Sequence, residues 1–409
     1  MNVEVHIDWA GETHAVGRLF GADRGTAVSF EYGPAWLARS DAFSIDPGSL
    51  PVRSGRHHAP SLFGAIQDCG PDRWGKILIE RAVRKRILTQ KPYQELDYVL
   101  ALDDATRLGA LRFRMPGESS FLTPNTGKLP PLVKLNSLMM ATDAIQQDTE
   151  TVKDLRFLLG AGSPLGGARP KSAVEFADGS LAIAKFPKPD DVRDIAAGEA
   201  LAMTLARAAG IRTAEAQLLR LKDRSVTVVK RFDRENGQRV PFISAATLLG
   251  LSSAAGAGSY TLLADGIRRF GHDVAGDLRE LWRRMVFSLL VCNFDDHLRN
   301  HGFLMRAPGR WALSPAYDIN PVPAIDHVHT AQTPISEETD EPSLQAAFHE
   351  ATRFGLKKDE AQSLLRQILP VVENWTSAGR ALKIKSAALS TYASAFEHPL
   401  IEEARRLSK

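Results

Sequence analysis

The sequence predicts an α+β protein that begins in a β-rich unit and ends in a mainly helical region. Three observations support this fold class, namely two patterns of apolar residues and the length and composition of the chain. Apolar residues alternate with polar ones at the start of the chain, as in half-buried strands, and recur every three or four positions in its last third, as in core-facing helices. The chain has 409 residues, of which 44% are hydrophobic and 24% charged, so it can form two or three packed domains.

The first predicted unit covers residues 1–115. Its first strand has an apolar residue at every second position from Val3 to Trp9. Further short strands are expected at residues 16–20, 28–32 and 109–113, and helices at residues 76–88 and 96–102. Residues 115–131 are rich in Pro, Gly, Ser and Thr, so we expect a linker there.

The second predicted unit covers residues 132–235 and contains a glycine-rich stretch, residues 160–171. The backbone amides of such a loop can approach phosphates closely, and Arg169 and Lys171 add positive charge nearby. The stretch matches neither the Walker pattern nor the Gly-x-Gly-x-x-Gly pattern of protein kinases. Taken alone it is a weak signal.

A lysine and a glutamate follow the glycine-rich stretch. Asp178-Gly179 predicts a hairpin whose second, apolar strand ends in Lys185, and a buried ammonium needs a partner or a phosphate. In the next predicted helix, residues 192–209, Glu199 falls on the apolar stripe. A strand lysine and a helix glutamate form the ion pair that positions ATP phosphates in kinases. The alternative is a solvated edge lysine with a glutamate at the rim.

A valine-rich strand, residues 225–232, closes the second unit. In a two-lobed kinase, the strand before the second lobe lends backbone groups to the adenine edge. That order places Lys230, Arg231 and Phe232 at the hinge.

The third predicted unit, residues 236–409, contains the stretch on which the functional interpretation depends, Asn293–Asn300. An amphipathic helix over residues 278–289 precedes it. Asp295 and Asn300 stand five positions apart, the spacing of a proton-accepting Asp and a metal-binding Asn in a kinase catalytic loop, and Asp318 can supply a second metal ligand. Asp and Asn are also common in surface turns, which leaves a purely structural role open.

Composition narrows the other possibilities. The net charge of +3 shows no overall basic excess with which the chain would bind nucleic acid by itself. Cys69 and Cys292 are too few for a disulfide framework, and nothing near them suggests a metal cluster. The first ten residues are charged rather than signal-like, and no apolar run approaches membrane-spanning length, so we expect a cytoplasmic protein.

Several stretches together resemble one family, the HipA-type serine/threonine kinases, which are the toxin half of bacterial toxin–antitoxin pairs. The matching stretches are Tyr32-Gly-Pro-Ala-Trp-Leu-Ala38, Pro71-Asp-Arg-Trp-Gly75, Leu165-Gly-Gly-Ala-Arg-Pro-Lys171, Lys185, Arg231-Phe-Asp-Arg234, Asp295-Asp-His-Leu-Arg-Asn300 and Leu313-Ser-Pro-Ala-Tyr-Asp318. The resemblance implies a two-lobed, protein-kinase-like fold with an extra β-rich subdomain, an α/β N-terminal lobe and a mainly helical C-terminal lobe.

The resemblance also implies roles for individual residues. Asp295 would be the catalytic base, and Asn300 and Asp318 would be magnesium ligands. Lys185, partnered by Glu199, would contact the phosphates of ATP.

Five further residues complete the predicted site. The backbone of Lys230, Arg231 and Phe232 would lie near adenine. His297 is placed with the nucleotide-binding residues, although it could merely brace the loop. Ser163 would be the inhibitory autophosphorylation site in a shifted register, because Pro164 stands where some members have that serine.

Family members phosphorylate a serine or threonine of a protein, with glutamyl-tRNA synthetase or another aminoacyl-tRNA synthetase as the characteristic target. A HipB-like helix-turn-helix antitoxin neutralises them, and the complex sits on operator DNA. Two alternatives stay open from the residues: a kinase for a small molecule or lipid, and a non-catalytic co-repressor that works only with its antitoxin.

Overall fold

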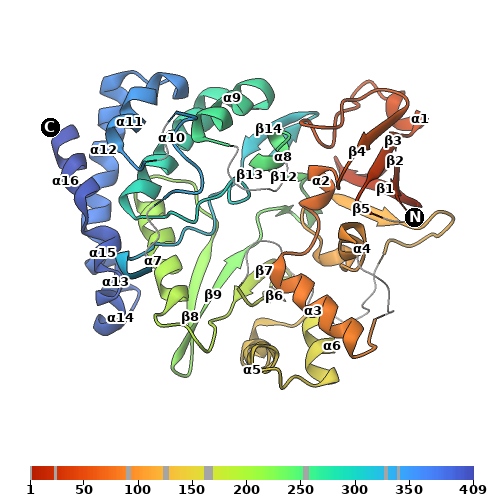
Figure 1. Ribbon diagram of the computed structural model, residues 1–409, viewed down its shortest axis with the longest axis horizontal. Helices are drawn as coiled ribbons and strands as arrows, with labels where there is room; N and C mark the ends of the chain where they lie inside the picture. Colours follow the sequence, from red (N-terminus) through yellow and green to blue (C-terminus); the bar gives the residue numbers. More distant parts are fainter. Residues whose placement is uncertain are drawn as a thin grey trace. The chain divides into compact units, whose positions relative to one another are not determined.

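The structure is a computed structural model that describes residues 2–22, 25–88, 94–122, 129–160, 169–251, 258–326, 330–338 and 341–409. It divides into two compact units, and the chain passes between them several times (Figure 1). The first unit comprises Met1–Asp190, Val228–Gly250 and Ala307–Gly309, and the second comprises Asp191–Thr227, Leu251–Arg306 and Arg310–Lys409. The three contiguous segments expected from the sequence stay a prediction about domains.

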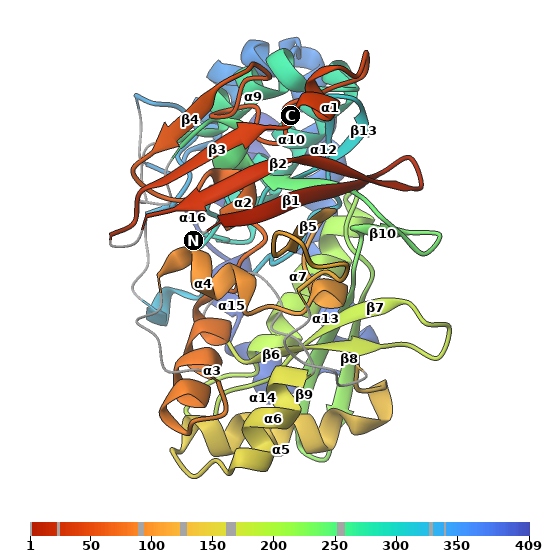
Figure 2. The ribbon, with the colours of Figure 1, turned by 90° about the vertical axis from the view of Figure 1, so that its right-hand side faces the viewer.

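The first unit begins with a five-stranded antiparallel sheet in the order β4-β3-β2-β1-β5, seen with its strands side by side in Figure 2. Its strands are β1 (Asn2–Trp9), β2 (Glu12–Gly21), β3 (Val28–Tyr32), β4 (Arg56–Ala59) and β5 (Leu111–Arg114). Val3, Val5 and Ile7 are buried, so the alternating pattern identified the core face correctly. The predicted β-rich start is confirmed.

Short helices and a hairpin complete the first unit. They are α1 (Pro34–Leu37), α2 (Gly64–Gln67), α3 (Arg73–Arg84), α4 (Glu95–Leu100), α5 (Leu135–Gln146), α6 (Val152–Gly160), β6 (Lys171–Glu175) and β7 (Leu181–Lys185). Helix α6 packs against α3 and α5. Strands β6 and β7 pair antiparallel around Gly179, which has a φ of +79°, so the predicted hairpin is confirmed. After them come β10 (Arg234–Glu235), β11 (Gln238–Arg239), β12 (Phe242–Ser244) and α8 (Ala245–Leu248).

The second unit is mainly helical, as the sequence predicts. Its elements are α7 (Ile195–Ala208), β8 (Ala216–Leu221), α9 (Tyr260–Phe270), α10 (Val274–Leu290), β13 (Gly302–Ala307), β14 (Arg310–Leu313), α11 (Leu344–His349), α12 (Lys358–Glu373), α13 (Trp375–Ala381), α14 (Ser386–Ser390), α15 (Ala393–Phe396) and α16 (Pro399–Leu407). Strand β9 (Arg224–Lys230) is divided between the units after Thr227. Helix α10 is central because α9, α11, α12 and α16 all pack against it (Figure 1).

No helix in the described part of the chain is both long enough and apolar enough to cross a membrane.

Candidate active site

Helix α10 carries the candidate catalytic loop. Leu281, Trp282 and Phe287 are fully buried on its inner face, which anchors the helix in the core of the second unit. The helix stops at Leu290, and Cys292 adopts a left-handed conformation with a φ of +50° that turns the chain into the loop. The loop therefore starts from a rigid support.

Two hydrogen-bonded links hold the segment around Asp318 against this loop. Asn293 accepts a hydrogen bond at Oδ1 from the backbone N–H of Asn320, at 3.0 Å. The Tyr317 hydroxyl donates to the backbone carbonyl of Arg299, at 2.7 Å. Asp318 lies between these two anchors, so its carboxylate is held near the loop that contains Asp295 and Asn300.

The two predicted metal ligands are oriented by their neighbours. The Asn300 amide nitrogen donates to the carbonyl of Asp295 at 3.2 Å. The amide oxygen of Asn300 is then the atom that would coordinate a cation. Asp318 has a φ of +58°, and its Oδ1 accepts from the Asn320 amide at 3.0 Å. One amide oxygen and one carboxylate suit Mg²⁺, which prefers hard oxygen ligands and keeps waters or phosphate oxygens in its remaining positions. Among the described residues, no group of three His, Cys, Asp or Glu side chains converges as a metal site.

Asp295 is exposed, yet the protein around its carboxyl group raises the pKa by desolvation. Repulsion from Asp318 and Asp296 raises this pKa further, whereas His297 opposes the rise. The interaction with Asp318 means that the two carboxylates are close enough to sense each other's charge. A cation held by Asp318 would relieve that repulsion and favour the ionised base.

Asp296 points inward, unlike its neighbour. Tyr260 at the start of α9 donates its hydroxyl to Asp296 Oδ2, and His301 Nε2 lies 3.1 Å from the same oxygen. Burial alone would raise the pKa of Asp296, but His301 and Tyr260 together bring it below its usual value. The buried carboxylate of Asp296 therefore holds the loop in place through its two partners, Tyr260 and His301.

Replacing Tyr260 by Phe should remove one hydrogen bond to this charged group and lower the free energy of unfolding by about 2 kcal/mol. Urea denaturation followed by fluorescence measures the change. Tyr32→Phe is the matched control, because the Tyr32 hydroxyl is buried as well but donates to a neutral carbonyl, that of Leu50 at 2.9 Å. Its expected loss is about 1 kcal/mol. Equal losses would contradict a charged acceptor at Asp296.

Of the other predicted site residues, Lys185 lies in the first unit. It is the half-buried last residue of β7, directly opposite Lys171 of β6. The Lys171 amine is buried 2.7 Å from the carboxylate of Asp72, which also caps α3 by accepting from the Gly75 N–H. The charge of Lys171 is therefore paired with that of Asp72, and the contribution of Lys171 to phosphate binding stays a prediction.

Glu199 is buried within α7 of the second unit, as its place on the apolar stripe predicts. The Tyr392 hydroxyl fixes the start of this helix by donating to the carbonyl of Asp194, at 2.9 Å. Lys185 belongs to the first unit, so the ion pair between Lys185 and Glu199 stays a prediction.

The predicted hinge residues lie where β9 ends. The backbone N–H of Arg231 donates to the carbonyl of Leu181 at 2.9 Å, and its guanidinium forms a two-bond fork with Asp233, with the shorter contact at 2.5 Å. Neither group is then left for a nucleotide. Adenine contacts through the Arg231 carbonyl or through Lys230 and Phe232 stay a prediction.

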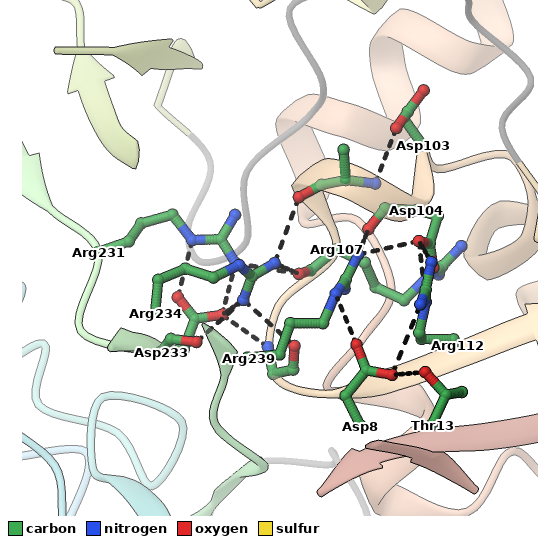
Figure 3. A network of polar contacts seen from close by, with 12 residues as sticks. Asp8, Thr13, Asp103, Asp104, Arg107, Arg112, Arg231, Asp233, Arg234 and Arg239 are labelled. Carbon is green, nitrogen blue, oxygen red and sulfur yellow. Dashed lines mark hydrogen bonds and ion pairs between the residues drawn. The ribbon is translucent and has the colours of Figure 1, made fainter. Parts of the chain in front are cut away.

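Arg231 is part of a larger arrangement in the first unit, which we call the arginine cluster (Figure 3). It consists of Arg107, Arg112, Arg231, Arg234 and Arg239 with the carboxylates of Asp8, Asp104 and Asp233. Arg107 donates to the carbonyls of Val99 and Leu102. The charged side chains of the motif Arg231-Phe-Asp-Arg234 are therefore paired within the arginine cluster.

Two predicted residues remain. His297 is half-buried beside Asp295, and its Nδ1 has no hydrogen-bond partner in the described part of the chain. Ser163, like all of residues 161–168, lies outside the described residues.

The fold belongs to the α+β class, and comparison with known proteins shows the family. The HipA N-terminal domain matches residues 8–114, and the HipA-like C-terminal domain matches residues 163–375. The chain belongs to the HipA family.

Individual relatives are more distant. The solved complex of Shewanella oneidensis MR-1 HipA, HipB and its operator DNA contains a chain with a TM-score of 0.67 and 17% identity, and the match covers 99% of this chain and 97% of that chain. The candidate kinase Y4dM of Sinorhizobium fredii is 32% identical over 145 residues, which are 32% of this chain and 35% of that protein. The match thus spans about a third of the curated relative. The Helicobacter pylori kinase CtkA matches with a TM-score of only 0.40, at 16% identity over 59% of this chain and 93% of that chain.

Proposed function

We propose that this chain is an ATP- and Mg²⁺-dependent protein serine/threonine kinase that acts as the toxin of a toxin–antitoxin pair. The observation that carries the proposal is the meeting of Asp295, Asn300 and Asp318 around one braced loop in the second unit. Membership of the HipA family supports it.

Each of these residues has a chemical task. Asp295 accepts the proton of the attacking hydroxyl, and its raised pKa makes it a better base once ionised. Asn300 and Asp318 would hold Mg²⁺, whose charge offsets that of the phosphate oxygens. His297 lowers the pKa of Asp295 and so favours the ionised form. Phosphoryl transfer depends mainly on positioning and electrostatics, which this rigid loop provides.

Further predicted residues would bind the nucleotide. Lys185 binds the phosphates with Glu199 as its partner, and the chain around Lys230, Arg231 and Phe232 lies along adenine. A phosphorylated Ser163 would regulate access to this site.

The proposed target is an aminoacyl-tRNA synthetase, such as glutamyl-tRNA synthetase, whose phosphorylation in the cytoplasm would inhibit translation. The proposed partner is a HipB-like helix-turn-helix antitoxin, and operator DNA would be bound through that complex. The Shewanella structure, which contains HipA, HipB and operator DNA, supports this partnership.

The test is incubation of the pure protein with γ-labelled ATP and cytosolic extract, with Mg²⁺ or with EDTA. We expect Mg²⁺-dependent label on a protein, and mass spectrometry identifies the protein and its acceptor residue. Label on a metabolite would show a small-molecule kinase instead. Calorimetry that detects no ATP binding would leave only the non-catalytic co-repressor.

A further inference from the structure

A short segment of the second unit, residues 331–336, lies along the catalytic loop. The backbone N–H of Gln332 donates to the carbonyl of Phe294 at 3.0 Å, and the Gln332 amide nitrogen donates to Asp295 Oδ1 at 2.6 Å. Farther along the segment, the carbonyls of Pro334 and Ile335 accept from the N–H groups of Tyr260 and Thr261. Gln332 is thus held by its own backbone and by its neighbours at the place where it meets Asp295.

The contact to Asp295 has a direct chemical meaning. A carboxylate has two oxygens, and fixing one of them by a donor sets the direction of the other. With Oδ1 bound to Gln332, Oδ2 is the oxygen left for the proton of an incoming hydroxyl. A neutral amide donor also stabilises the ionised carboxylate without neutralising it, and such charge-assisted bonds are stronger than neutral ones.

The geometry points to Gln332 as a positioning residue for Asp295: its amide holds the carboxylate of the base in one orientation. This inference rests on the proposed function, since it assigns Gln332 a part in the same reaction. The backbone hydrogen bond between Gln332 and Phe294 favours a positioning role over an inhibitory contact that is released when a substrate binds. It fixes Gln332 to the loop residue beside Asp295, so both would stay in place together when a hydroxyl binds.

Kinetics of Gln332→Leu test the inference, because leucine has a similar volume and no donor. We expect kcat to fall by about tenfold or more, as for loss of a hydrogen bond to a charged group, with the KM for ATP unchanged. The acid limb of the kcat profile should move to higher pH, since the ionised base loses a donor. The other groups that face Asp295, namely His297, Asp318 and Asp296, are the same in both proteins. Gln345→Leu, at an exposed position of α11, is the matched control.

A second measurement does not need activity. The pKa of Asp295 can be followed by NMR of protein with ¹³C-labelled aspartate, with the signal assigned through Asp295→Asn. Gln332→Leu should raise this pKa, and Gln332→Glu should raise it more, because a like charge replaces the donor. An unchanged pKa, or a rise in kcat in Gln332→Leu, overturns the inference. If the wild-type protein transfers no phosphate but Gln332→Leu still raises the pKa of Asp295, the proposed function is wrong and the contact between Gln332 and Asp295 stands.

Discussion

Asp295→Asn is expected to lower the rate of phosphate transfer by about a thousandfold, the middle of the range for loss of a general base. Asparagine has the same shape as aspartate but cannot accept the hydroxyl proton in the same way. The loop should keep its fold, because Asn300 bonds to the backbone carbonyl of residue 295 and not to its side chain. The loss should therefore appear in kcat.

Single-turnover transfer from labelled ATP measures this rate, and calorimetry of ATP binding serves as the internal check. Asp359→Asn, at an exposed position in the first turn of α12, is the matched control and should transfer phosphate like the wild type. If Asp295→Asn incorporated label at the wild-type rate, transfer by this site would be excluded.

Asp233→Asn is expected to lower the free energy of unfolding by about 3–5 kcal/mol, the loss typical of breaking a buried ion pair. Asp233 is buried, and it accepts from Arg231, from Arg234 at 2.6 Å and from the Gly109 N–H at 2.7 Å. An asparagine leaves both guanidinium groups without their shared counter-charge in the arginine cluster. Chemical denaturation gives the change, and an unaltered unfolding midpoint would contradict it.

The pH dependence of stability offers a second view of the same carboxylate. Burial would raise the pKa of Asp233, but Arg231 and Arg234 lower it to about 2. The pKa of Asp233 is lower in the folded state than its unfolded value near 4, so the ionised carboxylate stabilises the protein at a pH above 4. This contribution is lost as the pH falls from about 4 toward 2. Wild type should lose stability in that window more steeply than Asp233→Asn.

The chain supplies a matched control for burial. Arg39 and Asp41 have the same two-residue spacing and the same fork, with contacts of 2.8 and 2.9 Å, but they lie near the surface. Water screens such a pair, so Asp41→Asn should change stability far less than Asp233→Asn. Similar losses would mean that the fork itself, and not its burial, determines the stability.

Local patterns predicted what local contacts determine. The apolar stripe of α10, the alternation in β1 and the turn at Gly179 each depend on neighbours within a few positions, and the structure confirms all three. The five-residue spacing of Asp295 and Asn300 is also a local feature, since one loop holds both residues.

Long-range contacts were not predictable in this way. The sequence gives no sign that Asp72 neutralises Lys171, or that Gln332 reaches Asp295, because these partners are far apart in the chain and follow no period. Tyr260 was missed for the same reason. The order of the strands predicts backbone contacts of Arg231 at the hinge, which stay a prediction, and does not indicate that its guanidinium binds Asp233.

The division of the chain between the units bears on how the protein is made. Asp8 and Asp104 each pair with Arg112 and also with Arg239, so a nascent chain must extend beyond residue 239 before the arginine cluster is complete. Folding of the first unit during synthesis thus cannot finish when its amino-terminal sheet leaves the ribosome. An expression fragment that stops at residue 190 would lack the strand ends and arginines contributed by Val228–Gly250, and should aggregate or be degraded.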